Sequence, residues 1–231
     1  MFRGMILFLF FCSGATALVY EVVWSKYLSL MLGSTVQAQT VVLAVFMGGL
    51  ALGNRLIGRR SDLLQKPLVA YGYLEVCIGL YAFFFSSIYA FADKIYIAVG
   101  SRLFESAVGM FLLKSALSLG LLLLPTILMG GTLPLLAAWL QRQSDDAGRW
   151  SARFYSTNSL GAVCGSFIAG FFLIRALGLV SALQITAFVN VLIGVTAVGL
   201  GRKLADEAPA PSAATSPAET AKPVENSGAM R

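Results

Sequence analysis

Four charged side chains lie inside long apolar stretches of this sequence: Glu21, Lys26, Glu75 and Lys114. Charge inside a hydrocarbon layer is costly, so such residues usually pair with each other or mark a substrate or proton path. Their chemistry would be ion pairing, proton transfer or binding of a charged solute. Lys26 is close enough to the expected end of its segment to extend its ammonium to the surface.

Position along the segments predicts which of these groups can meet. Glu21 and Lys114 both fall in the outer halves of their segments, so we expect them to pair. Glu75 falls in the inner half of its segment, near the start of the segment that carries Arg153, Tyr155 and Asn158. Two interpretations stay open, structural struts between helices and parts of a substrate pathway.

The residues absent from the sequence exclude several kinds of chemistry. There is no histidine, which excludes Ser/His and Cys/His catalysis and histidine-ligated metal sites. The glycine pair in Met129-Gly-Gly-Thr132 lies in an apolar helix rather than after a strand, so it predicts no phosphate loop. We therefore expect no catalytic residue, metal or cofactor, and no nucleic-acid binding.

The composition is that of a multi-pass helical membrane protein. Of the 231 residues, 58% are hydrophobic and 12% are charged, against about 45–50% and about 25% in an ordinary soluble domain. The mean hydropathy is +0.79. A spanning helix needs about 20 mostly apolar residues. The sequence predicts an all-α bundle of about six spans, near residues 5–28, 40–57, 68–91, 107–140, 152–174 and 179–200. Residues 92–105 are mixed in character and predict an interfacial connection.

The stretch 107–140 is too long for one straight crossing, and Pro125 and Pro134 interrupt it. We expect a kinked helix, with the freed backbone groups satisfied by Thr126 or Thr132 and by a neighbouring helix. The alternative is a discontinuous helix that forms a substrate or ion site.

Two glycine pairs have the spacing that lets helices approach closely, Gly49 with Gly53 and Gly161 with Gly165. We favour packing inside the chain over a dimer face, because the motif is common and unspecific.

The basic residues predict the orientation. With the N-terminus inside, the inner loops hold ten basic residues: Arg3, Arg55, Arg59, Arg60, Lys66, Arg142, Arg149, Arg153, Arg202 and Lys203. The outer loops hold three: Lys94, Arg102 and Arg175. Both termini are expected in the cytoplasm. We expect a transmembrane domain over 1–203 and a disordered Ala/Pro/Ser-rich tail over 204–231.

Four stretches together resemble the membrane domain of the fused major-facilitator/spermidine-synthase-like proteins of bacteria. They are Ser13-Gly-Ala-Thr-Ala-Leu-Val-Tyr-Glu-Val-Val-Trp24, Phe46-Met-Gly-Gly-Leu-Ala-Leu-Gly53, Leu124-Pro-Thr-Ile-Leu-Met-Gly-Gly-Thr-Leu-Pro-Leu-Leu136 and Phe154-Tyr-Ser-Thr-Asn-Ser-Leu-Gly161. The resemblance covers about residues 5–200. It carries over, as membrane motifs only, Tyr20, Glu21, Trp24, Gly49, Pro125, Pro134, Asn158 and Gly161. Tyr20 thereby joins the candidate polar site.

The loop Gly58-x-x-x-Asp62 followed by Lys66 is similar to the facilitator signature between spans two and three. It departs from that signature at Leu63, where a basic residue is usual, and at Gln65, where glycine is usual. The resemblance implies a fold like one half of a major facilitator.

In that family a soluble aminopropyltransferase-like domain, which binds an adenosyl cofactor, follows the membrane part. No glycine-rich loop after a strand is present here, so no catalytic residue carries over. The expected role is a bacterial inner-membrane anchor, partner or transport module in polyamine-related metabolism. Its expected partners are the bilayer and a separate soluble synthase-like protein or a second copy of the chain. The alternative is a small-solute transporter, in which Glu21, Glu75 and Lys114 bind a charged solute such as a cationic amine.

Overall fold

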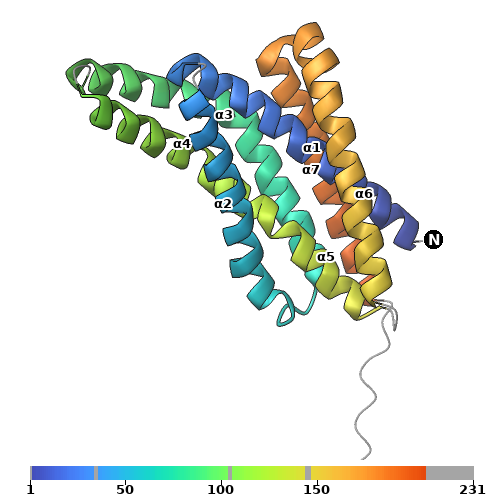
Figure 1. The fold of residues 1–231 in the computed structure, drawn as a ribbon. Coiled ribbons are helices and arrows are strands. Elements are labelled where there is room, and N and C mark those ends of the chain that lie inside the picture. The colour runs from blue at the N-terminus through green and yellow to red at the C-terminus, as the bar shows by residue number, and fades with distance from the viewer. Residues whose placement is uncertain (1, 34–35, 104–105, 144–146, 207–231) are drawn as a thin grey trace, which may run out of the picture.

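The structure is a computed structural model that describes residues 2–33, 36–103, 106–143 and 147–206. Helix dominates these ranges, and they contain no strand. The elements, shown in Figure 1, are α1 (Phe2–Leu32), α2 (Val36–Ser61), α3 (Pro67–Leu103), α4 (Ala107–Gly130), α5 (Thr132–Gln141), α6 (Ala147–Ile168), the π-helical turn η1 (Ala169–Leu173) and α7 (Ile174–Asp206).

Five helical stretches of the described chain are long and apolar enough to cross a membrane: Gly4–Leu32, Gln39–Ser61, Pro67–Leu103, Ala107–Gln141 and Gly148–Leu204. The last has 57 residues and, if straight, would be about 86 Å long at 1.5 Å per residue. It is not straight, because Gly178 has φ 74° and ψ 173°, outside the helical region. Glycine adopts such a positive φ without steric cost. The chain turns back here and α7 descends along α3 (Figure 1).

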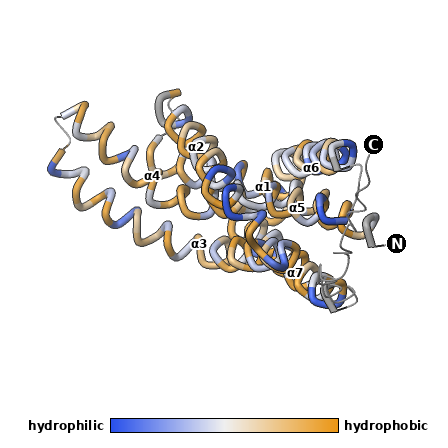
Figure 2. The backbone as a smooth tube through the Cα atoms, turned by 90° about the horizontal axis from the view of Figure 1, so that it is seen from below, coloured by the Kyte–Doolittle hydropathy of each residue, from blue (hydrophilic) through white to orange (hydrophobic). Residues whose placement is uncertain are grey.

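The prediction of an interfacial connection over 92–105 is wrong for residues 92–103, the part that the structure describes. Helix α3 continues without interruption to Leu103 and has 37 residues. Polar side chains such as Asp93 and Lys94 lower the hydropathy but do not break a helix, and no proline occurs in this stretch. The distal half of α3 and the start of α4 extend beyond the other helices in the ribbon and in the backbone tube (Figures 1 and 2).

The sequence predicts one kinked helix over 107–140, and the structure has two helices there. Helix α4 ends at Gly130 and α5 begins at Thr132, with Gly131 between them. Pro125 lies inside α4 and has no N–H for the carbonyl of Leu121. The Tyr81 hydroxyl of α3 donates to that carbonyl at 2.7 Å, so a neighbouring helix replaces the missing bond.

The hydroxyl groups near the break bond to their own helix. Thr126 donates to the Leu122 carbonyl at 2.7 Å, and Thr132 donates to the Met129 carbonyl at 2.8 Å. Pro134 is the third residue of α5. The first backbone N–H groups of a helix have no acceptor within that helix, so a proline is tolerated there.

Helices pack mainly in the pairs α3 with α7, α1 with α6, and α2 with α4. Glycines make all three approaches close, and between α3 and α7 these are Gly72 and Gly194. A Cβ at Gly49 or Gly53 would collide with Thr126 or with the Ile127 carbonyl of α4. Both glycine pairs therefore face contacts inside this chain, since Gly161 and Gly165 lie in the same way against the backbone of α1.

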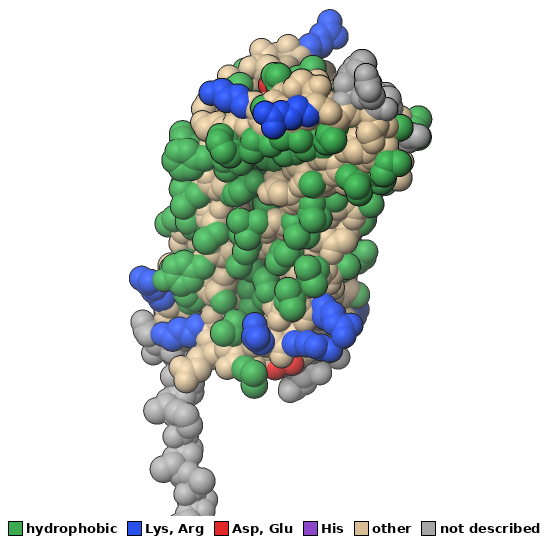
Figure 3. Space-filling model, turned by 90° about the vertical axis from the view of Figure 1, so that its left-hand side faces the viewer, with side chains coloured by type: hydrophobic (Ala, Val, Ile, Leu, Met, Phe, Trp, Pro, Cys, Tyr) green, Lys and Arg blue, Asp and Glu red, His purple; other side chains and the backbone are tan. Residues whose placement is uncertain are grey.

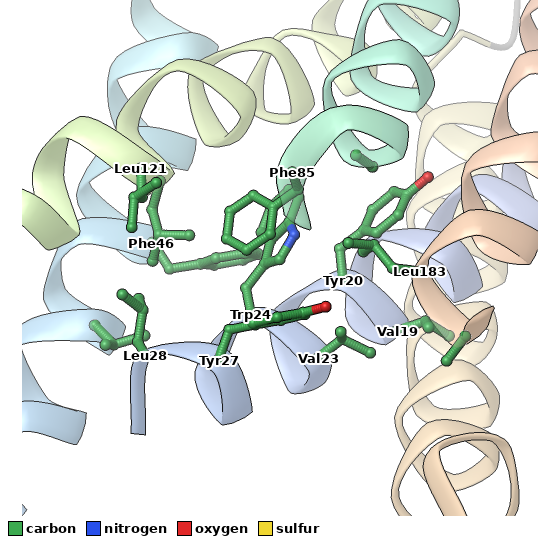
Figure 4. Packing of buried hydrophobic residues seen from close by; sticks show 14 of the residues in the cluster. Val19, Tyr20, Val23, Trp24, Tyr27, Leu28, Phe46, Phe85, Leu121 and Leu183 are labelled. Carbon is green, nitrogen blue, oxygen red and sulfur yellow. The ribbon is translucent and has the colours of Figure 1, made fainter. Parts of the chain in front are cut away.

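The larger of two buried hydrophobic clusters surrounds Trp24 (Figure 4). The Trp24 ring stacks on Tyr20 and on Phe85, each with centroids 5.2 Å apart. The second cluster joins Phe10 of α1 to Tyr71 of α3. Outside these clusters a hydrophobic belt separates Lys and Arg side chains at the two ends of the molecule (Figure 3).

The domain boundary expected at 203 lies within α7, which continues to Asp206. The remainder of the expected tail, 207–231, lies outside the described residues.

Candidate functional site

Glu75 is the most deeply buried carboxyl group of the described chain, with 1% of its surface exposed. It lies on α3, eight residues after the first residue of that helix. The Ser13 hydroxyl of α1 donates to Glu75 Oε1 at 2.5 Å. The Asn190 side-chain amide of α7 donates to the Glu75 backbone carbonyl at 2.8 Å. Two helices distant in sequence thus position this residue.

Thr16 connects these two partners of Glu75. Its hydroxyl lies 2.6 Å from Asn190 Oδ1 and 2.9 Å from the Ser13 carbonyl. Ser13 and Thr16 are one turn apart on α1, so both face α3 and α7. The four side chains form one buried network that links α1, α3 and α7.

A cavity of about 120 Å³ opens beside this network at the centre of the bundle. Every helix from α1 to α7 contributes to its wall, and Glu75 is the single charged residue among the lining residues of the described chain. The polar lining residues are Ser13, Thr16, Tyr20, Glu75, Thr132, Asn158 and Asn190. The rest of the wall is apolar and includes Phe46, Leu50, Ile78 and Met129.

Tyr20 brings an unsatisfied group to this cavity. Its side chain is fully buried, and its hydroxyl has no hydrogen-bond partner among the described residues. Figure 4 shows the hydroxyl on the side of the ring remote from Trp24. Buried hydroxyl groups nearly always have a partner, so an orphan at a cavity wall calls for an explanation.

The candidate polar residues separate into two groups. Glu75, Tyr20 and Asn158 come together around the cavity. Glu21 and Lys114 do not, and the pair expected between them is absent from the described structure. Lys114 instead donates to the Leu32 carbonyl at 2.6 Å. Leu32 is the last residue of α1, where carbonyls lack helical partners and the helix dipole is negative.

The neighbours expected for Glu75 at the start of α6 are only partly correct. Asn158 shares the cavity with Glu75, but Tyr155 is 61% exposed and Arg153 lies over the Trp150 ring at 5.2 Å. The reason is that α6 packs on α1, so only one face of it reaches the centre. The residues that do bond to Glu75 were missed, although Asn190 is a lone amide in the apolar run from Ala187 to Ile193.

An arginine outside the loop that is similar to the facilitator signature donates hydrogen bonds to the loop backbone. Arg142, just after α5, donates to the Asp62 carbonyl at 2.8 Å and to the Gln65 carbonyl at 3.1 Å. The Lys66 carbonyl accepts from the first amides of α3, and Ser61 bonds back to Gly58. The planar Arg142 guanidinium can donate to both carbonyls at once from fixed positions, whereas a lysine ammonium has no such fixed arrangement of donors.

A carboxyl group removed from water is costly unless donors or a cation satisfy it. Here the neutral Ser13 hydroxyl is the side-chain donor, and no ion pair to Glu75 occurs in the described chain. The described residues also contain no group of three or more Cys, Asp or Glu placed to hold a metal ion. Among the described residues, the Glu75 carboxyl group therefore has neutral neighbours and no positive counter-charge.

Comparison with known proteins finds distant relatives. The chain is 27% identical over 195 residues, 84% of its length, to polyamine aminopropyltransferase 2 of Streptomyces coelicolor. It is 29% identical over 184 residues, 76% of its length, to polyamine aminopropyltransferase of Mycobacterium tuberculosis. Polyamine aminopropyltransferase 1 of Streptomyces coelicolor is 23% identical over 197 residues. These matches support a spermidine-synthase-like relationship.

The chain spans about a third of the length of the curated relatives it matches, 33%, 32% and 34% respectively. No family model and no solved structure matches the chain. A match over 84% of the chain includes most of the helical bundle, since the bundle occupies nearly all residues up to 206.

Proposed function

We propose that this chain is a membrane module of a spermidine-synthase-like system, located in a bacterial inner membrane. The observation that carries this proposal is the match of most of the helical bundle to proteins named polyamine aminopropyltransferases. The five apolar helical stretches support the membrane location. The module anchors or organises aminopropyl-transfer chemistry that a soluble synthase-like partner carries out.

The proposed topology has six crossings and resembles one half of a major facilitator. The turn at Gly178 supports the sixth crossing, because it divides a 57-residue apolar stretch into two passes. Reporter fusions test this. A fusion after Lys203 or at Gln65 should report cytoplasm, and one at Gly178 should report the opposite side. A cytoplasmic signal at Gly178 would refute six crossings.

Partner capture tests the anchoring role. The full chain, tagged and solubilised from its native membrane after cross-linking, should co-purify with a synthase-like protein or with a second copy. We expect aminopropyltransferase activity in that fraction. A chain that emerges alone after cross-linking, with no activity in its fraction, would contradict the proposal.

A second candidate function is transport of a small cationic solute. The observation that favours it is the cavity at the centre of all seven helices, with Glu75 as its charged wall residue. In proteoliposomes, flux of a cationic solute should depend on Glu75 and not on Glu21, which does not line the cavity. Flux that is equal in the two Glu→Gln variants would exclude this use of the cavity.

A further inference from the structure

We propose that the central cavity binds one primary alkylammonium ion, with Glu75 as its counter-ion and the apolar wall around its alkyl stem. The inference rests on the second candidate function above, the solute-binding role, and names the class of ligand. It concerns equilibrium binding, so it can hold whether or not the ligand crosses the membrane.

The charge of the cavity selects a cation. Glu75 is 1% exposed, and the side chains of the described chain that lie beside it, from Ser13, Tyr71 and Asn190, are neutral. No Lys or Arg lines the cavity in the described chain. Buried charges are normally paired, and a bound cation would supply the missing partner. An anionic ligand would face the carboxylate with no compensating positive group.

The unsatisfied Tyr20 hydroxyl supplies an independent reason for a ligand. The Tyr20 side chain is fully buried, Tyr20 is one of the residues that line the cavity, and its hydroxyl has no partner among the described residues. An ammonium group has three N–H donors and no acceptor. Oxygens on Glu75, Tyr20 and Asn158, which come from α3, α1 and α6, are the acceptors that such a group needs.

The apolar part of the wall favours an alkylammonium over a metal ion. Calcium takes six to eight oxygen ligands, and magnesium keeps several waters. Here a single carboxylate faces Phe46, Leu50 and Met129, which suit methylene groups. The cavity volume of about 120 Å³ suits one small organic group, since an engineered apolar cavity of about 150 Å³ binds benzene. A short alkylammonium such as n-butylammonium is of this size.

Titration of the purified chain tests this directly. The chain in nanodiscs of zwitterionic lipid is titrated with n-butylammonium chloride by calorimetry, at constant ionic strength. We expect saturable binding of one ion per chain. Glu75→Gln should weaken it by about tenfold or more, since a buried charge loses its partner. Glu21→Gln is the matched control and should leave it unchanged, because Glu21 does not line the cavity.

A second pair of variants keeps the test independent of the folding of the Glu75 variant. Tyr20→Phe should weaken binding, whereas Ser118→Ala should not. Both hydroxyls are buried without a partner in the described chain, but only Tyr20 lines the cavity.

Three results would overturn the inference. They are no saturable binding to the folded wild-type chain, equal binding of n-butanol, and displacement of the probe by equimolar sodium or potassium chloride. Failure of the anchoring role would appear in partner capture instead. Failure of the transport role would appear as binding without flux.

Discussion

The Tyr81 hydroxyl donates at 2.7 Å to the Leu121 carbonyl, the group that Pro125 leaves without an amide donor four residues later. The proline in α4 and the tyrosine on α3 therefore form one unit. Proline is tolerated in apolar helices when a neighbouring helix satisfies the freed backbone group.

Removing this donor should destabilise the bundle. We expect Tyr81→Phe to cost about 0.6 kcal/mol and at most about 1.7 kcal/mol, the average and the maximum for hydrogen bonds between membrane helices. Adding Pro125→Ala should recover part of the loss, because an alanine N–H can bond to the Leu121 carbonyl. Unfolding equilibria in mixed micelles measure both variants. Tyr20→Phe serves as the control, since the Tyr20 hydroxyl is buried without a hydrogen-bond partner in the described chain. Additive effects of the two substitutions on the free energy of unfolding would contradict the coupling of Tyr81 with Pro125.

Ser13→Ala should also destabilise the chain. It removes the side-chain donor to Glu75 and leaves a buried carboxyl group with fewer partners. The expected cost is about 1–3 kcal/mol, and Glu75→Gln in the same chain should reduce it. Ser118→Ala is the matched control, because the Ser118 hydroxyl is buried without a partner in the described structure. Unfolding at equilibrium is the measurement, and equal costs for the two serine variants would contradict the network.

Glu21→Gln and Lys114→Met should have independent effects. Lys114 bonds to the end of α1 and not to Glu21, and about 11 residues separate Glu21 from Leu32, roughly 16 Å along a helix. A double-mutant cycle should give a coupling within about 0.5 kcal/mol of zero. A coupling above about 1 kcal/mol would restore the ion pair that the sequence alone predicts.

Gly165→Ala should be strongly destabilising. A Cβ there meets the Ala15 backbone carbonyl of α1, so the two helices must separate. Overpacking typically costs about 1–3 kcal/mol. Gly148→Ala on the same helix has nothing within 4 Å and should be neutral or stabilising, because alanine favours helix by about 1 kcal/mol. Thermal unfolding of both variants is the check, and similar midpoints would argue against close packing of α1 on α6.

Local features of this sequence predict much of what the structure contains. The apolar stretches predict helices because a helix satisfies its own backbone hydrogen bonds within one segment. The interruption expected within 107–140 is confirmed and lies at Gly131, because proline and glycine act on their own helix. The end expected for the third helix is wrong, because residues 92–103 contain charge but no proline.

The site depends on which helices become neighbours. Glu75 and Asn190 are 115 positions apart and meet because α7 packs on α3. Glu21 and Lys114 match in expected depth, yet the end of α1, not Glu21, lies beside Lys114. Depth along a segment is a property of one helix and can be read from its sequence. Contacts between helices depend on side-chain shape and hydrogen bonding across interfaces, so only the tertiary structure decided the partners of Glu75.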